Sequence, residues 1–245
     1  MQERAYAVEF HGVRKAFREG RDVLDRFTLS VGRGETVALV GPSGCGKTTA
    51  LRLVNRLLAA DGGVVRVMGR DVSEENPVEL RRRIGYVIQE GGLLPHWTVE
   101  ENVETVPRLL GWAPDRRRGR VREVLEMVNL PADEFSRRHP RELSGGQRQR
   151  VGVARALAAD PDLVLMDEPF GALDPIARRA LQKEFLSWKR ELRKSVLLVT
   201  HDISEAFRLA DRVAIVRAGQ VVQVGTPREI AESPADDFVR EFAAP

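Results

Sequence analysis

Apolar and polar positions alternate in short runs over the first third of the chain. Residues 5–10 and 27–31 follow this period-two pattern, and Gly-Arg-Gly at residues 32–34 predicts a turn. Such runs are typical of strands with one buried face, so we expect a small, mostly antiparallel sheet here. Residues 36–40 form a continuous, mostly apolar run, which predicts a strand buried on both faces.

Helical spacing replaces this alternation after the buried strand. A helix is predicted over residues 47–60 from apolar side chains three or four positions apart, at Leu51, Val54, Leu57 and Leu58. From about residue 77 to residue 140 the chain is rich in arginine and again helical in period, with an apolar face formed by Val121, Val124, Leu125 and Val128. We interpret this stretch as an inserted helical subdomain.

Helices and buried strands alternate in the second half. A helix is expected from residue 147 to residue 159, and apolar runs at 163–166 and 196–199 predict two strands. Residues 213–245 predict a closing hairpin and a C-terminal helix. Apolar strands separated by helices indicate a parallel sheet with helices on both faces. The fold class is therefore α/β, and we expect a single domain over residues 1–245.

The composition is that of an ordinary globular protein. The chain has 245 residues, 42% of them hydrophobic, which is enough for a real core. Its 39 basic and 36 acidic residues nearly cancel, to +3, so a pI near 9.3 does not indicate a nucleic-acid partner. Arginine clusters at 81–83 and 116–118 are typical of solvated faces.

Cysteine use and the N-terminus indicate where the chain works. Cys45 is the only cysteine, which excludes an intramolecular disulfide and favours the cytosol. Residues 1–4 lack the apolar core of a signal peptide, and no run reaches the roughly 18 apolar residues that span a bilayer. We expect the chain to reach a membrane only through a partner.

A phosphate-loop pattern of glycine, four residues, glycine, lysine and serine or threonine begins at Gly41. In such a loop backbone N–H groups point at the phosphates, Lys47 neutralises the β and γ oxygens, and the Thr48 hydroxyl ligates Mg²⁺. The alternative is a glycine turn without a ligand, which the flanking strand and helix disfavour. The expected nucleotide-binding residues are Gly41, Pro42, Ser43, Gly44, Cys45, Gly46, Lys47, Thr48 and Thr49.

Acidic and polar side chains follow three predicted strands. Asp167 and Glu168 end a buried strand, where ligands bind in open parallel sheets; Asp167 suits Mg²⁺ and Glu168 suits an attacking water. His201 follows another buried strand, and the sheet topology is expected to bring it to the same edge as Glu168. Gln89 follows a short apolar run, and its amide can ligate Mg²⁺ or the water. Together these groups suit phosphoryl transfer to water.

These residues also have structural alternatives. Acidic residues often end strands and cap helices, and a lone histidine is usually structural. We keep that structural interpretation for His11, His96 and His139. Cys45 lies near a helix N-terminus and beside Lys47, so we expect a reactive thiolate; the alternative is an inert, packed residue.

A second glycine-bearing segment, Leu-Ser-Gly-Gly-Gln at residues 143–147, also opens a predicted helix. With this segment, the order of the motifs resembles the nucleotide-binding subunits of ATP-binding cassette (ABC) transporters over nearly the whole chain. The resemblance implies a P-loop NTPase cassette with a mixed or parallel core sheet, an antiparallel β subdomain and a helical subdomain. It adds to the nucleotide-binding residues Phe17, Gln89, Ser144, Gly145, Gly146, Gln147 and Asp174.

The resemblance also implies a role for each matched residue. Phe17 corresponds to the aromatic residue that stacks on adenine. The implied catalytic residues are Glu168, His201, Lys47 and Gln89. The implied Mg²⁺ ligands are Thr48, Gln89 and Asp167.

Two cassettes of this family meet head to tail, so the resemblance implies a dimer around two MgATP. Each ATP then lies between the phosphate loop of one chain and residues 143–147 of the other. The second copy can be identical or a homologous cassette. Further implied partners are membrane permease subunits, bound through the helical subdomain at the cytoplasmic face of the cell membrane, and a separate solute-binding protein. No nucleic-acid partner is expected.

A finer resemblance concerns residues 84–103, 106–110 and 234–242, which look like those of ATPases that power bacterial import of glycine betaine, choline and carnitine. The alternative is that apolar residues of the first stretch are simply core: Leu93, Leu94, Trp97 and Val99. The chain ends near the cassette boundary, so we do not expect the regulatory modules that follow many betaine-type relatives.

Other functions stay open from the sequence. One is a cassette for another solute, such as an amino acid, methionine or a sulfonate, or for export. More remote are a nucleic-acid-associated cassette, which would carry long insertions or a second cassette, and an ATP-sensing scaffold without hydrolysis. Glu168 and His201 argue against the scaffold.

Overall fold

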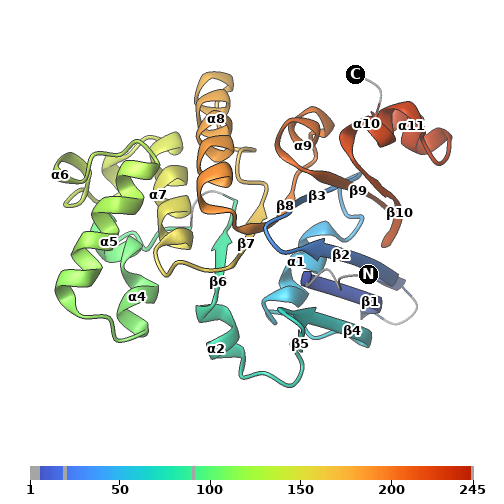
Figure 1. The fold of residues 1–245 in the computed structure, drawn as a ribbon, viewed down its shortest axis with the longest axis horizontal. Helices are drawn as coiled ribbons and strands as arrows, with labels where there is room; N and C mark the ends of the chain where they lie inside the picture. Colours follow the sequence, from blue (N-terminus) through green and yellow to red (C-terminus); the bar gives the residue numbers. More distant parts are fainter. Residues whose placement is uncertain (1–5, 19–20, 90–91, 244–245) are drawn as a thin grey trace. The chain divides into compact units, whose positions relative to one another are not determined.

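The computed structural model forms two compact units and describes residues 6–18, 21–89 and 92–243. The first unit joins Met1–Arg81 to Lys194–Pro245, and the second is Arg82–Arg193; most of their elements are labelled in Figure 1. The second unit begins near the start of the helical insert expected at 77–140, and it also includes a later strand and two long helices. Outside the described residues lie the first residue of the strand expected at 5–10, two residues of the betaine-type stretch, and the last two residues of the C-terminal segment.

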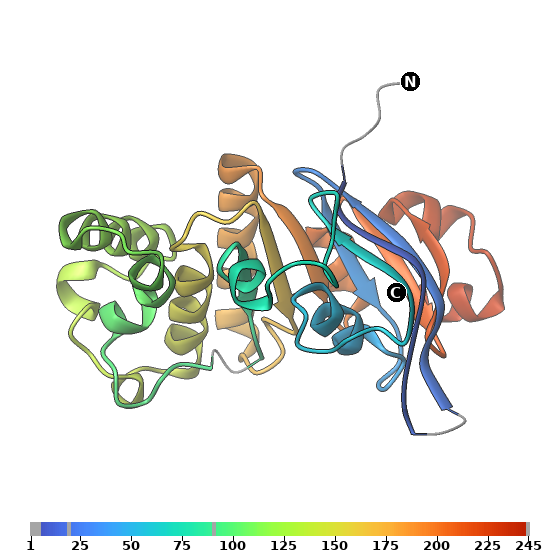
Figure 2. The same ribbon diagram turned by 90° about the horizontal axis from the view of Figure 1, so that it is seen from below.

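One sheet of the first unit is antiparallel, with the strand order β2-β1-β4-β5. Its strands are β1 (Tyr6–Arg18), β2 (Arg21–Gly32), β4 (Gly62–Val67) and β5 (Arg70–Asp71). The buried rings of Phe10 and Phe27 meet edge to face, with their centroids 5.1 Å apart. The expected antiparallel sheet is confirmed. β1 and β2 are longer than predicted because β1 pairs with β2 on one side and with β4 on the other (Figure 2).

The other strands of the first unit follow the order β10-β9-β3-β8. They are β3 (Thr36–Val40), β8 (Ser195–Val199), β9 (Arg212–Arg217) and β10 (Gln220–Gly225). β9, β3 and β8 are parallel, and β10 returns antiparallel to β9 as the closing hairpin. Every residue of β3 and β8 is buried. The register pairs Leu39 with Val199, so β3 and β8 end at the same edge.

The helices of the first unit are short: α1 (Lys47–Val54), α2 (Pro77–Arg82, at the unit boundary), α9 (Ile203–Leu209), α10 (Pro227–Glu232) and α11 (Asp237–Ala243). α1 ends before the residue 60 predicted for it. Asn55 is its C-cap, and Arg56 has a left-handed backbone with φ 53°. Leu57 therefore lies in a turn and is 49% exposed, although its spacing fits the helix.

The second unit combines two parallel strands with several helices (Figure 1). β6 (Ile84–Val87) pairs with β7 (Leu163–Asp167). Its helices are α3 (Val99–Val103), α4 (Thr105–Leu109), α5 (Pro114–Met127), α6 (Ala132–Phe135), the 3₁₀ turn η1 (Pro140–Glu142), α7 (Gly145–Leu157) and α8 (Pro175–Leu192). α3, α5 and α7 contact one another, and the apolar face predicted from Val121 to Val128 is buried between them.

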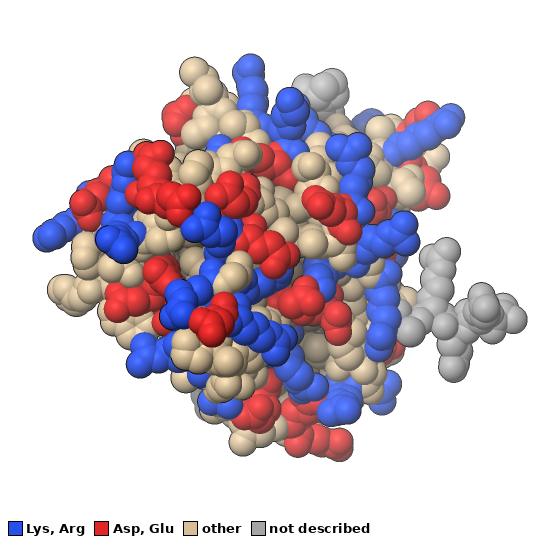
Figure 3. Space-filling model, turned by 60° about the vertical axis from the view of Figure 1, so that its left-hand side comes forward, with Lys and Arg blue, Asp and Glu red and all other residues tan. Residues whose placement is uncertain are grey.

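The surface carries charges of both signs. On the face shown in Figure 3, acidic and basic side chains are interspersed rather than gathered by sign. This distribution agrees with the interpretation of the arginine clusters as solvated faces. Within the described ranges, no helix has both the length and the apolar character needed to cross a bilayer.

Candidate nucleotide site

The phosphate loop, residues 41–49, connects β3 to α1 in the first unit. Two of its glycines are required by close backbone contacts. A Cβ on Gly41 would lie 2.1 Å from the carbonyl oxygen of Val216, and one on Gly46 would lie 2.8 Å from that of Val23. Both glycines also have a positive φ, 155° and 105°, which other residues rarely adopt. Neighbouring strands therefore fix the path of the loop.

The outer part of the loop is open. Pro42, Ser43 and Gly44 are exposed, and a Cβ on Gly44 would meet no atom within 4 Å. α1 begins at Lys47, and its N-cap Gly46 has no side chain to offer to the first N–H groups. The N–H groups of a first helical turn lack intrahelical acceptors and attract anions. This helix start can therefore receive phosphate oxygens.

Lys47 is only 7% exposed. Its Nζ donates hydrogen bonds to the carbonyl oxygens of Gly41, at 2.7 Å, and Pro42, at 3.0 Å. A buried ammonium needs such acceptors because leaving water without them is costly. The bonds hold the positive charge inside the loop, where phosphate oxygens can replace the carbonyls.

Cys45 does not match the expected reactive thiolate. It is 6% exposed, and its Sγ lies 3.8 Å from Nζ of Lys47. Burial raises the pKa of the Cys45 thiol, and the opposing attraction of Lys47 is smaller. The prediction is wrong because the sequence shows the lysine and the helix start but not the burial.

Phe17, expected to stack on adenine, lies in β1 and is 57% exposed. Nζ of Lys15 lies 5.7 Å from its ring centroid, over the ring. Lys15 pairs with Leu24 of β2, and a Cβ on Gly46 would lie 2.6 Å from Cδ2 of Leu24. Phe17 thus offers an exposed ring on a strand pair that touches the phosphate loop.

His201 and the phosphate loop follow neighbouring parallel strands of the first unit. The N–H of Thr200 donates to the carbonyl of Leu39 at 3.1 Å, which extends the pairing of β8 with β3. His201 is exposed, and Asp202 after it caps α9 with its carboxylate. The first unit therefore places His201 and the loop at one sheet edge.

In the second unit, Gln89 lies after β6, and Asp167 and Glu168 lie at the end of β7. The register pairs Val87 with Met166, so the two strands end at one edge. Asp167 is the last residue of β7, and Gln89 is exposed in the turn after β6. This edge therefore gathers two carboxylates and one amide.

Glu168 has an unusual backbone conformation for a residue with a side chain. Its φ is 45°, and it precedes Pro169. Such a left-handed conformation costs on the order of 1–3 kcal/mol and is concentrated at functional sites. The carbonyl of Glu168 accepts the N–H of Gly171 at 3.2 Å, which closes the turn. Seven other non-glycine residues of the described ranges, Arg56 among them, share this conformation, so by itself it does not mark Glu168 as functional.

The expected Mg²⁺ ligands Thr48, Gln89 and Asp167 supply hydroxyl, amide and carboxylate oxygens. Among the residues that the structure describes, no three His, Cys, Asp or Glu side chains gather as a metal cluster. Mg²⁺ prefers oxygen ligands and usually keeps waters and substrate phosphates instead of a full protein cage. The donor set therefore fits Mg²⁺ held together with a nucleotide.

The segment at residues 143–147 opens α7 with a capping box. Oγ of Ser144 accepts the N–H of Gln147 at 3.2 Å, and the N–H of Ser144 donates to Oε1 of Gln147 at 2.8 Å. A Cβ on Gly146 would lie 3.4 Å from Cβ of Ala177 in α8, which is an ordinary van der Waals distance, so packing does not require glycine there. Ser144 and Gly145 are exposed. They are the part of the segment that a ligand can reach.

Asp174 has a structural task in this chain. Its carboxylate caps α8 and accepts the N–H groups of Ile176 and Ala177, both at 3.0 Å. The sequence signal is an aspartate just before Pro175 at the first helical position. The expected nucleotide contact of Asp174 thus has a capping alternative.

The sequence did not predict the contact between the phosphate loop and the turn that joins β9 to β10. The N–H of Gly219, between β9 and β10, donates to the carbonyl of Cys45 at 3.1 Å. A Cβ on Gly219 would lie 2.5 Å from the carbonyl oxygen of Val23. These are backbone contacts between distant segments, so no residue pattern announces them.

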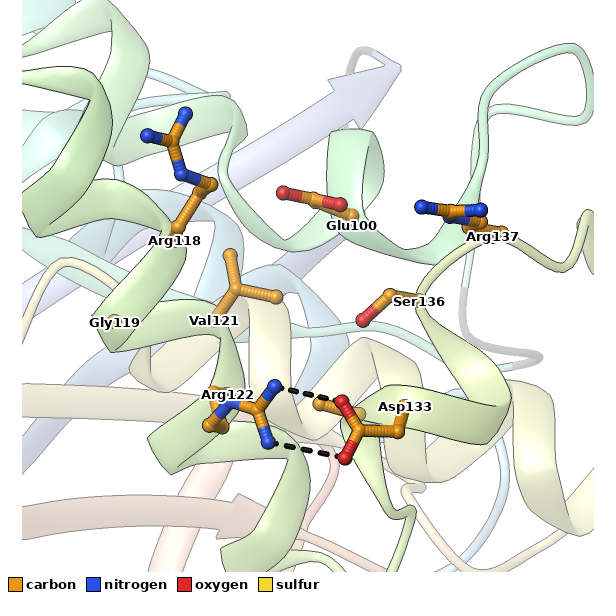
Figure 4. Close-up of a pocket in the computed structure, with 9 residues that line it drawn as sticks. Glu100, Arg118, Gly119, Val121, Arg122, Asp133, Ser136 and Arg137 are labelled. Atoms are coloured by element: carbon orange, nitrogen blue, oxygen red, sulfur yellow. Dashed lines mark hydrogen bonds and ion pairs between the residues drawn. The ribbon is translucent and has the colours of Figure 1, made fainter.

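A pocket of about 560 Å³ lies elsewhere in the second unit (Figure 4). It is lined by Glu100, Arg118, Gly119, Val121, Arg122, Ala132, Asp133, Ser136 and Arg137. Arg122 and Asp133 neutralise each other through bonds of 2.6 and 3.3 Å. None of the predicted site residues lines this pocket.

Several curated proteins match this chain over most of its length. A family model described as ABC transporter matches residues 24–171, more than half of the sequence. The glycine betaine/carnitine/choline transport ATP-binding protein OpuCA of Bacillus subtilis is 51% identical over 230 residues, 94% of this chain and 60% of that protein. The glycine betaine uptake system ATP-binding protein YehX of Escherichia coli is 47% identical, over 96% of this chain and 76% of that protein.

The chain spans about 60% of the length of the first curated relatives that it matches. A solved dimeric ATP-binding cassette in a post-hydrolysis state, bound to ADP and Pi, is 33% identical with a TM-score of 0.80. That match covers 89% of this chain and 98% of the solved one. The fold, the motifs and these relatives show that the chain belongs to the ABC transporter family.

Proposed function

We propose that this chain is the ATP-hydrolysing subunit of an importer for quaternary amines such as glycine betaine, choline or carnitine. The observation that carries the ATPase assignment is the phosphate loop, which is open outside, holds Lys47 within and begins α1 without a side-chain cap. The solute class is supported by the names of relatives that are 50–51% identical over 94% of the chain.

ATP is the substrate of the proposed site. The N–H groups of the loop and of the first turn of α1 receive phosphate oxygens. Lys47 exchanges its bonds to Gly41 and Pro42 for bonds to the β- and γ-phosphoryl oxygens. The exposed ring of Phe17 stacks on adenine.

Hydrolysis is assigned to residues that follow the strand ends. Thr48, Gln89 and Asp167 would hold Mg²⁺, which when bound neutralises charge on the β- and γ-phosphoryl oxygens. The oxygen of the attacking water bonds to the γ-phosphorus, and Glu168 accepts a proton from that water. The bond from the γ-phosphorus to the bridging oxygen breaks, and His201 donates a hydrogen bond to the departing phosphoryl group. The products are ADP and phosphate.

A second copy of the chain, or a homologous cassette, completes the site in this proposal. The Ser144 hydroxyl accepts one N–H and still has its own proton to donate, and Gly145 beside it is exposed. These groups contact the ATP held by the partner's loop, so two chains enclose two MgATP. The solved relative described as a dimeric cassette bound to ADP and Pi supports the dimer.

ATP-driven closing and opening of the dimer would drive a permease at the cytoplasmic face of the membrane. The helical subdomain is the proposed permease contact, and a separate solute-binding protein delivers the solute.

Glu168→Gln tests the ATPase assignment. The amide cannot take the proton from water, so we expect turnover to fall by at least ~100-fold while the Kd for MgATP changes by less than about twofold. Steady-state phosphate release and nucleotide titration measure the two quantities. A variant that turns over at nearly the wild-type rate would contradict the mechanism.

Uptake into vesicles that contain the cassette, its permease and its binding protein tests the solute class. We expect ATP-dependent uptake of betaine, choline or carnitine, and none of an amino acid or a sulfonate. Uptake of only the comparison solutes would overturn the solute class and leave the ATPase assignment intact.

A further inference from the structure

Within the described residues, no hydrogen bond fixes the side chain of Gln89, which is exposed. Its position therefore depends on the backbone that carries it. β6 leads into it and pairs with β7 up to Val87 and Met166. After Gln89, the next described contact of the backbone is made by Gly92.

α7 packs against β6, and its side chains contact the backbone before and after Gln89. Nη1 of Arg155 donates to the carbonyl oxygen of Gly92 at 2.8 Å. On the near side, Nε2 of Gln149 approaches the carbonyl oxygen of Ile88 at 3.5 Å, a weaker contact. The Arg155 bond is the strong tie of the two.

β6 and α7 also lie too close to slide past each other. A Cβ on Gly85 would lie 2.6 Å from the carbonyl oxygen of Ala156, the residue after Arg155. Glycine is thus needed where the strand meets the end of α7. β6 and α7 are therefore closely packed next to Arg155.

The Arg155 side chain is half-buried, and burial lowers the pKa of its guanidinium. A guanidinium remains charged even so, and a desolvated charge favours any acceptor within reach. Arg155 also lies in the last turn of α7, where the helix dipole stabilises positive charge. Burial and the helix dipole therefore both favour the hydrogen bond from Arg155 to the carbonyl of Gly92.

We propose that Arg155 is a positioning residue for Gln89, which it ties through Gly92 to α7. α7 begins at the Ser144 cap, so one rigid helix of about 20 Å joins the segment that faces the partner's ATP to the backbone of Gly92, three residues after Gln89. Contact of Ser144 with the partner's nucleotide then sets the place of Gln89. The inference rests on the proposed function and assigns to it a residue that the motifs do not include.

Loss of the tie should slow the chemical step and spare nucleotide binding, because the loop that holds ATP is elsewhere in the chain. For Arg155→Met we expect kcat to fall about tenfold, with the KM for ATP within about twofold of wild type. Arg155→Lys keeps the charge and one donor, so it should recover part of the rate.

Arg120 offers a matched control. It is also an arginine bonded to backbone carbonyls at the end of α7, at 2.8 Å to Leu157 and 3.2 Å to Ala158, but these bonds do not reach Gly92. Arg120→Met should lower the melting temperature about as much as Arg155→Met and leave kcat per folded molecule within about twofold of wild type.

A double-mutant cycle with Gln89→Ala separates positioning from general damage. If Arg155 acts through Gln89, Arg155→Met should change kcat by less than about twofold once Gln89 is alanine. Independent, multiplying effects of the two substitutions in an active enzyme would overturn the inference. A wild-type chain without ATPase activity would instead overturn the proposed function.

A readout without nucleotide completes the test. Hydrogen exchange by mass spectrometry should show faster exchange, by about tenfold, in peptides containing Gln89 and Gly92 in Arg155→Met but not in Arg120→Met. Unchanged exchange in Arg155→Met would contradict the tie. If Arg155→Met does not fold, Arg155→Lys is carried through the same cycle and exchange measurement, with smaller changes of the same sign expected.

Discussion

The two glycine-bearing helix starts of this chain differ in what satisfies their first N–H groups. The phosphate loop begins α1 at a glycine without a side-chain cap, whereas Ser144 and Gln147 close a capping box on α7. Gly41 and Gly46 are confined by backbone of their own unit, whereas Gly145 is exposed. The first start is shaped to hold an anion by itself. The second is already capped, and only a hydroxyl proton and a bare glycine face outward.

Other capping boxes in the chain sharpen this comparison. Thr98 with Glu101 and Thr226 with Glu229 form the same reciprocal pair of bonds at α3 and α10. The capping box at Ser144 is therefore a common way to begin a helix. It differs from the other two in its neutral glutamine and in the glycines after the cap. Motifs that look alike in sequence thus differ in structure: one helix start has no side-chain cap, and the other closes a capping box.

Alanine at the two kinds of glycine should have the most unequal effects. Gly41→Ala puts a Cβ 2.1 Å from the carbonyl of Val216, so the strands or the loop must move. We expect a loss of about 3 kcal/mol of unfolding free energy and a melting temperature lower by roughly 6–12 °C. For Gly145→Ala we expect a change within ~0.5 kcal/mol. Urea and thermal unfolding measure both.

Equal destabilisation by the two alanines would break the comparison. It would mean either that β9 yields to a methyl group or that Gly145 is confined by contacts of its own.

Removing the cap at Ser144 should affect both stability and activity. Ser144→Ala and Thr226→Ala each lose a cap bond to an N–H, so each should cost about 1 kcal/mol. Only Ser144→Ala also removes a donor to the partner's ATP, so only it should lower kcat, by about tenfold. Denaturation and phosphate release compare the two. Equal rates at matched folded fraction would remove Ser144 from the site.

Acid should distinguish the charged capping box from the neutral one. The N–H of Thr226 donates to Glu229 and lowers the pKa of that carboxylate. Because the folded pKa lies below the unfolded one, the stabilisation is present above the ordinary range of glutamate and is lost as the pH falls through the lowered value. Gln147 does not titrate, so the cap of α7 should not share this loss.

Urea unfolding of wild type and Glu229→Gln between neutral pH and about pH 3 tests this expectation. The stability difference between the two proteins should shrink as the pH falls. A difference that stays constant, or grows in acid, would contradict the assigned pKa direction.

Thiol chemistry gives the smallest effect. Burial raises the pKa of Cys45, so its thiol should stay protonated and slow to alkylate at neutral pH, with or without MgATP. A cysteine placed at the exposed start of α7, Gly145→Cys in a Cys45→Ser background, should react at least ~10-fold faster. Fast labelling of native Cys45 that MgATP blocks would restore the reactive thiolate expected from the sequence.

Sequence reasoning succeeded for the buried strands, because a run of apolar residues is itself the signal. Buried runs predicted β3, β7 and β8. The spacing of Ser144 and Gln147 also fits a capping box, although the box was not predicted. The end of α1 was wrong because Leu57 fits the helical period and yet follows a left-handed residue. The pKa of Cys45 was misjudged because burial is a tertiary property.

Backbone contacts were beyond prediction for a different reason. The carbonyls that confine Gly41 and Gly219 belong to strands far away in sequence, and a carbonyl has no residue identity. The tie from Arg155 to Gly92 is of the same kind, since any residue supplies the acceptor. Such contacts appear only when the strands are placed.

The central claim is that the ATP site is completed between two chains. Light scattering of Glu168→Gln with MgATP tests it most directly, since this variant should hold ATP without consuming it. The account predicts the mass of two chains with MgATP, the mass of one chain without it, and the mass of one chain for Glu168→Gln combined with Ser144→Arg, although that chain still binds ATP. A single chain with ATP bound, or a dimer indifferent to Ser144→Arg, would contradict the account.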